Sequence, residues 1–214
     1  MIKKDDFVMI DFVGRVASSN KIFDLTDKSV AEKEGISGDF NFGPILVIPE
    51  SDYVIKPISN SLIGKNPGDK YSINVQAKDG FGEFNNKLIK TYGLNSFRDN
   101  NVNPQVGDLV MLDDKLATVL SVSGGRVMVS FNHPLAGKDL IYEINVIKII
   151  EDNKEKCSAI FQHYVGKTPD SLSLEESNVK ITYKEDIKPY LITAIEEDIK
   201  KYVNKDFKVS ISKG

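Results

Sequence analysis

FNHPLAGK at residues 131–138 marks the point where one kind of sequence gives way to another. Asparagine, proline and glycine within so few residues are typical of a turn. After the turn, apolar side chains recur at every second position, at Leu140, Tyr142, Ile144 and Val146, which is the period of a half-buried β-strand. We therefore expect a strand at residues 140–146 that closes a sheet begun earlier in the chain.

The beginning of the chain supplies the other strands of that sheet. Residues 7–16 are rich in β-branched and aromatic side chains, and residues 44–49 are an apolar run between two prolines. Residues 71–75 alternate between apolar and polar side chains. All three segments predict strands.

Between these strands, the sequence predicts one helix and one surface segment. The helix is expected over residues 54–62, with Pro57 in its first turn, where proline is tolerated. The polar residues 26–43 predict a surface segment with a short helix at 30–34 and a turn around Gly38.

Residues 86–131 differ in character from the segments on either side. Short strands are predicted at 109–112, 117–122 and 126–131, and SGG at 123–125 is typical of a tight hairpin turn. Such short strands predict a small all-β domain, inserted between two strands of the first sheet.

Residues 153–214 predict a C-terminal α+β module, which the charged run at 151–156 separates from the rest. Its first helix is predicted by apolar residues at helical spacing, namely Cys157, Ile160, Phe161, Tyr164 and Val165. A second amphipathic helix lies between two alternating segments. We expect this module to fold independently of the rest of the chain.

Several segments resemble, in the same order, the SlyD type of FKBP peptidyl-prolyl cis/trans isomerases. FNHPLAGK resembles the segment by which these proteins re-enter the isomerase domain after an inserted domain. The other segments are DFVGRV at 11–16, IFD at 22–24, PILV at 44–47, VI at 54–55, IGKNPGDK at 63–70 and FGE at 81–83. Together they extend over residues 6–150, and the additional C-terminal module makes the chain most similar to the long archaeal members.

The resemblance implies an α+β fold in which an FKBP antiparallel half-barrel wraps on a helix. Residues 1–85 and 132–152 would form this isomerase domain. Residues 86–131 would form an inserted-in-flap chaperone domain, and residues 153–214 a C-terminal α+β domain.

The resemblance also implies an apolar pocket that catalyses rotation about X-Pro bonds. Rotation must break amide resonance, a barrier of about 18–20 kcal/mol, and a dry apolar site favours the less polar twisted form over the planar amide. The catalytic residues implied are Asp24, which faces the twisting amide, Phe81, Tyr142, and Ile55, whose N–H donates to a substrate carbonyl. The substrate-binding walls implied are Phe12, Phe23, Ile45, Val47, Val54 and Ile58.

Three of these positions depart from the family pattern. Phe12 and Phe81 stand where members usually carry tyrosine, and Ile58 stands where they often carry a large aromatic residue. The loss of the hydroxyl at Phe81 removes a donor to the bound peptide. We expect weaker catalysis and no tight macrolide binding as a result.

Composition indicates a globular chain, with 41% hydrophobic and 28% charged residues among 214. No apolar run approaches the ~18 residues of a membrane span, and a net charge of −3 gives no basic surface for nucleic acid. A signal peptide is not recognisable, so a cytoplasmic location is expected. Cys157 is the single cysteine, and neither histidine has a second ligand at suitable spacing, so no disulfide, metal or cofactor is expected.

The partners expected are unfolded or nascent proline-containing polypeptides, with neither nucleic acid nor membrane, and a second copy of the chain bound through the C-terminal domain. Two alternatives stay open. One is a binding chaperone with little isomerase activity. The other is a ribosome or RNA binder, if VGDLVM at 106–111 begins an SH3-like barrel, although the acidic balance of the chain argues against phosphate binding.

Overall fold

The computed structural model describes residues 1–36 and 42–214. These residues form two compact units, one of Met1–Asn74 with Ile141–Gly214 and the other of Val75–Leu140. The expected mixed α+β class with antiparallel sheets is confirmed. The turn expected around Gly38 lies outside the described residues. Among the helices described, none has the length and apolar character needed to cross a membrane.

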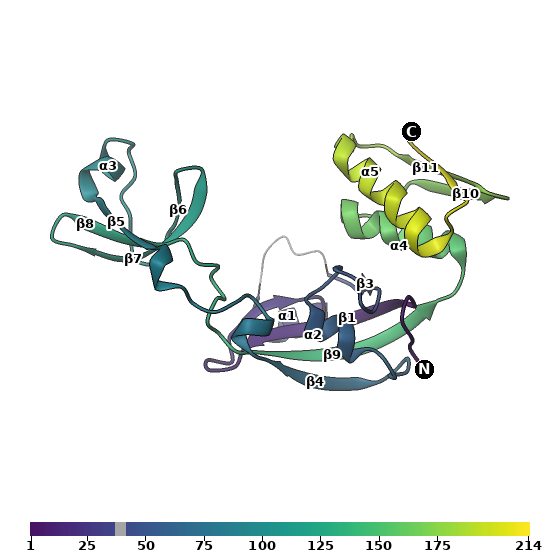
Figure 1. The fold of residues 1–214 in the computed structure, drawn as a ribbon, viewed down its shortest axis with the longest axis horizontal. Helices are drawn as coiled ribbons and strands as arrows, with labels where there is room; N and C mark the ends of the chain where they lie inside the picture. Colours follow the sequence, from purple (N-terminus) through teal and green to yellow (C-terminus); the bar gives the residue numbers. More distant parts are fainter. Residues whose placement is uncertain (37–41) are drawn as a thin grey trace. The chain divides into compact units, whose positions relative to one another are not determined.

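A sheet in the order β2-β1-β9-β4 is the base of the first unit, with β3 pairing to β1 as well (Figure 1). Its strands are β1 (Phe7–Val16), β2 (Ile22–Leu25), β3 (Ile45–Val47), β4 (Lys70–Val75) and β9 (Leu140–Ile150). β1 runs antiparallel to both β2 and β3. Because β9 lies between β1 and β4, this strand completes the sheet begun by the first residues of the chain, as its alternation predicted.

Two short helices accompany this sheet. α1 (Lys28–Lys33) begins after Asp27, whose side chain accepts hydrogen bonds from the N–H groups of Ser29 and Val30. α2 (Lys56–Ser61) has Pro57 in its first turn and buries Ile58. It is shorter than the predicted helix, because Val54 and Ile55 precede it in extended or irregular backbone.

The second unit contains a separate sheet in the order β5-β8-β7-β6 (Figure 1). Two short 3₁₀ helices precede this sheet. In chain order, the elements of the unit are η1 (Ala77–Asp79), η2 (Asn86–Leu88), β5 (Ile89–Gly93), α3 (Leu94–Arg98), β6 (Leu109–Leu112), β7 (Lys115–Ser123) and β8 (Arg126–Ser130). Gly124 and Gly125 join β7 to β8 with φ of 56° and 73°, which is the backbone that a two-residue hairpin turn needs. Phe97 of α3 packs on the buried valines of the sheet.

The C-terminal module has two helices and a three-stranded sheet in the order β10-β11-β12. Its elements are α4 (Asn153–Val165), β10 (Ser171–Glu175), β11 (Asn178–Tyr183), α5 (Pro189–Asp198), a π-helical turn η3 (Ile199–Val203) and β12 (Lys208–Lys213). β11 and β12 are parallel. α4 ends at Gly166, whose φ of 79° suits glycine.

One hydrophobic core joins this module to the first sheet. Ile160, Phe161 and Ile195 belong to the same buried cluster as Phe7 of β1 and Ile48 after β3, and each of the five is 0% exposed. This shared core argues against a module that folds independently, and that expectation stays a prediction for truncation to test. The amphipathic stripe of α4 correctly predicted that one helix face is buried, but a stripe does not say which neighbour buries it.

Candidate active site

Three aromatic rings from three neighbouring strands meet on one face of the first sheet. Tyr142 of β9 lies 5.8 Å from Phe12 of β1, between ring centroids, and 5.7 Å from Phe23 of β2, with the second pair edge to face. Such tilted and edge-to-face arrangements are favourable for aromatic pairs. The structure thus brings together three of the residues that the resemblance assigned to the pocket.

Gly14 makes this close packing possible. A Cβ atom at this position would lie 2.8 Å from Cζ of Phe23 and 3.1 Å from Cε1 of Tyr142. Phe23 is half-buried, so its ring can move outward, whereas Tyr142 is only 3% exposed. Gly14 was noticed in the sequence only as part of a motif, because its role depends on two rings that are distant in sequence.

Replacing Gly14 by alanine is expected to displace the Phe23 ring and lower prolyl isomerase activity about tenfold, since misplacing a group that contacts the substrate by about 1 Å can cost up to a hundredfold. The strand itself should survive, because alanine fits the backbone of β1. Peptide turnover and the thermal midpoint, measured together, check this. Loss of folding without a selective loss of activity would contradict the explanation.

Asp24 lies beside this cluster, paired with Gly14 in the β1–β2 ladder. The residue as a whole is exposed, so its carboxyl is only partly desolvated. Desolvation raises the pKa of this carboxyl, while the N–H of Leu25 favours its charged form. Burial also raises the pKa of the Tyr142 hydroxyl, and the charge of Asp24 adds to that effect. A carboxylate therefore stands near the hydroxyl at the edge of the aromatic cluster.

The segment before α2 supplies the residues expected on the helix side. Val54 and Ile55 are half-buried, and Ile58 is 2% exposed. The carbonyl of Ile55 accepts from the N–H groups of Ile58 and Ser59. In residues 1–36 and 42–214, the N–H of Ile55 itself has no hydrogen bond acceptor, so it is available to a ligand carbonyl.

The remaining predicted residues have different surroundings. On β3, Ile45 pairs with Ile10 and is half-buried, while Val47 pairs with Val8 and is 0% exposed. Val47 is thus a core residue in the free protein. Phe81 belongs to the second unit, where its ring stacks on that of His133 at 4.4 Å with 2° between the planes. This stacking was not predicted, because His133 was interpreted only as a turn residue.

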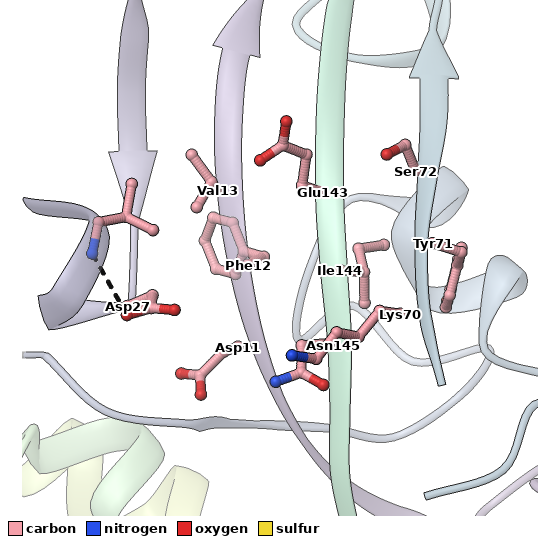
Figure 2. Close-up of a pocket in the computed structure, with 11 residues that line it drawn as sticks. Asp11, Phe12, Val13, Asp27, Lys70, Tyr71, Ser72, Glu143, Ile144 and Asn145 are labelled. Carbon is pink, nitrogen blue, oxygen red and sulfur yellow. Dashed lines mark hydrogen bonds between the residues drawn. The ribbon is translucent and has the colours of Figure 1, made fainter. Parts of the chain in front are cut away.

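The opposite face of the first sheet has a groove of about 360 Å³ (Figure 2). Side chains alternate along a strand, so Asp11 and Val13 project away from Phe12, and Glu143 projects away from Tyr142. Asp11 accepts a hydrogen bond of 2.9 Å from Thr26. Desolvation raises the pKa of its carboxyl. Charged and apolar side chains line the groove together, and Phe12 is the one predicted pocket residue among those that line it.

Within residues 1–36 and 42–214, no group of three or more histidine, cysteine or acidic side chains could hold a metal ion. Burial raises the pKa of the Cys157 thiol to about 12, so it stays protonated in the core.

Comparisons with known proteins find similarity to peptidyl-prolyl isomerases. A family model described as "FKBP26, IF domain" matches residues 93–135. The short-type peptidyl-prolyl cis-trans isomerase of Methanocaldococcus jannaschii is 29% identical over 147 residues, which are 68% of this chain and 92% of that protein. The FKBP-type isomerase SlyD of Treponema pallidum is 30% identical over 111 residues, which are 50% of this chain and 62% of that protein.

The chain is similar to FKBP-type peptidyl-prolyl isomerases over about two thirds of its length. The inserted-domain match and the SlyD relatives confirm the SlyD-like FKBP resemblance. The FKBP-type 16 kDa isomerase of Escherichia coli is a further relative, 26% identical over 43% of this chain and 64% of its own length. The chain spans less than two thirds of these two bacterial FKBP proteins. The N-terminal domain of FKBP42 from Arabidopsis thaliana is a loose structural likeness, with 14% identity, coverage of 70% and 76%, and a TM-score of 0.36.

Proposed function

We propose that the first sheet and α2 form an FKBP half-barrel that isomerises X-Pro bonds. The observation that carries this proposal is the Phe12–Phe23–Tyr142 cluster with Asp24 at its edge, in a chain similar to FKBP-type isomerases. The rings would hold the proline in an apolar environment that favours the twisted amide. The N–H of Ile55 would hold the substrate carbonyl, and Asp24 would face the twisting bond.

The division into domains is part of the proposal. Residues 1–85 with 132–152 would form the isomerase domain, 86–131 the inserted domain and 153–214 the C-terminal domain. The family match at 93–135 and the separate sheet β5-β8-β7-β6 support an insert. Phe81, which lies in the second unit, stays a predicted catalytic residue of the isomerase domain.

The inserted domain would capture unfolded or nascent polypeptides for the isomerase. Its sheet buries one face on Phe97 and exposes apolar side chains on the other, with exposed fractions of 58% for Leu109, 65% for Met111 and 53% for Leu116. Leu109 and Met111 lie on β6, which is an edge strand. An apolar edge strand suits binding of an extended chain by strand addition.

Other expected properties remain predictions. The apolar faces of α4 and α5 that suggested a homodimer are buried within the chain itself, so a dimer through the C-terminal domain would need a different surface, which sedimentation can detect. A cytoplasmic location and the absence of nucleic acid and membrane partners are likewise still to be measured.

Replacing Asp24 by asparagine is expected to lower kcat/KM on a short prolyl peptide at least about tenfold, since one positioned polar group commonly contributes this much or more. Glu143→Gln is the matched control, because it makes the same change on the opposite face of the sheet, next to Tyr142 in sequence. The kcat/KM of Glu143→Gln should stay within about twofold of the wild-type value, because substitutions of exposed surface residues usually have small effects.

The assay also separates the proposal from its alternative. A wild-type chain that fails to isomerise the peptide but prevents aggregation of an unfolded protein would be a binding chaperone without isomerase activity. If Asp24→Asn and Glu143→Gln lowered kcat/KM equally, the active site would not be at Asp24.

A further inference from the structure

Tyr53 joins the isomerase segment to the C-terminal module. It immediately precedes Val54 and Ile55 in the chain. Its hydroxyl donates a hydrogen bond of 2.7 Å to Oδ2 of Asp198, the last residue of α5. The two residues are 145 positions apart in sequence, so no local pattern reveals the contact.

The Tyr53 ring is also held by side chains of the C-terminal module. It packs against His163 with 4.1 Å between ring centroids. Tyr164 and Tyr202 meet it edge to face at 6.5 Å and 6.1 Å. The ring is therefore fixed by aromatic neighbours as well as by its hydroxyl.

A second tyrosine binds the same carboxylate oxygen. The hydroxyl of Tyr164, on α4, donates to Oδ2 of Asp198, also at 2.7 Å. Desolvation raises the pKa of both hydroxyls, and the charge of Asp198 raises them further. Both tyrosines thus stay protonated donors at neutral pH, and hydrogen bonds to an ionised acceptor are among the stronger ones.

The segment that Tyr53 anchors is irregular backbone. It begins at Glu50, whose φ is 65°, and has local hydrogen bonds from Ser51 to Ile48 and from Tyr53 to Ser51. Only one residue separates Tyr53 from Ile55, so at most about 7 Å of chain lies between their Cα atoms. Tyr53 and Ile55 therefore lie in one short segment, in which the position of Tyr53 restricts that of Ile55.

We propose that Tyr53 and Asp198 are positioning residues, through which the C-terminal module sets the placement of Val54 and Ile55 and hence the affinity of the pocket for its peptide. The inference rests on the proposed isomerase function. It gives the C-terminal module a part in catalysis, where the sequence suggested a part in assembly alone.

The test compares two variants that each remove one hydrogen bond to the same oxygen. Tyr53→Phe removes the bond from the isomerase segment, and Tyr164→Phe removes the equivalent bond within the C-terminal module. In the full chain, Tyr53→Phe should raise KM for a prolyl peptide about three- to tenfold with little change in kcat, because the ring stays and only the anchor is lost. For Tyr164→Phe, KM should stay within about twofold of the wild-type value, and the thermal midpoint should be similar to that of Tyr53→Phe. Asp198→Asn should follow Tyr53→Phe.

Amide NMR spectra give a readout that does not depend on turnover. The Ile55 N–H resonance should shift in Tyr53→Phe and stay in place in Tyr164→Phe. Equal changes in the two variants, in KM or in the spectrum, would show a general loosening and overturn the inference, as would an unchanged Tyr53→Phe. A wild-type chain without isomerase activity would instead remove the proposed function, while the Ile55 resonance would still report on the anchor.

Discussion

Truncation after Ile150 is expected to unfold or strongly loosen the isomerase part of the chain. Phe7, Leu46, Ile48 and Ile150 are each no more than 3% exposed, and all four lie in the cluster that contains the C-terminal helices. Full exposure of a large apolar side chain costs about 1.5–3 kcal/mol. Exposure of four would remove up to about 6–12 kcal/mol, which is comparable to the whole stability of a typical domain.

Circular dichroism melts and binding of a hydrophobic dye measure this effect. Two point variants in the full chain serve as references. Ile160→Ala, in the shared core, should cost about 2–5 kcal/mol, and Tyr190→Ala, at a residue that is 65% exposed on α5, should cost less than about 0.5 kcal/mol. A truncated chain that melts cooperatively near the full-length temperature and turns over peptide normally would restore the independent module expected from the sequence.

Local patterns were sufficient for most of the longer elements and for the family resemblance. The alternation at Leu140–Val146 predicted β9 because a strand with one buried face must repeat every two residues, whereas its place beside β1 came only from the structure. The ordered motifs were sufficient for the FKBP family, because their combination is more specific than any one of them. β5 (Ile89–Gly93) was not predicted, since it is a short edge strand with only Ile89 and Tyr92 partly buried.

Contacts between distant segments could not be predicted in this way. Gly14 becomes informative only when Phe23 and Tyr142 are both known to meet it. Asp198 follows two other acidic residues at 196–197 on an amphipathic helix, and nothing in that run distinguishes an anchor for Tyr53 from a solvated charge. An apolar helix stripe or a carboxylate predicts that some residue contacts it, and only the tertiary structure shows which residue that is.

The two ends of residues 86–131, the proposed inserted domain, lie next to each other, so removal of these residues should be tolerated. The N–H of Asn85 donates to Oδ1 of Asn132 at 2.9 Å, and Nδ2 of Asn132 donates back to the carbonyl of Asn85 at 3.0 Å. Joining these two residues by a short loop therefore costs little more entropy than a native hairpin. We expect a chain without residues 86–131 to fold.

This deletion should separate the turnover of short prolyl peptides from that of unfolded proteins. Peptide turnover should change less than about twofold, whereas catalysed refolding of a proline-limited protein should fall about tenfold to a hundredfold, because capture by the insert raises the effective concentration of client prolines. The double variant Leu109→Ser with Met111→Ser should reproduce much of the loss with the domain in place, and Lys115→Ser on the neighbouring strand should not. The ratio of the two rates decides the matter: an equal fall for peptide and protein would make the insert structural, and a fall in neither would mean that it takes no part in client capture.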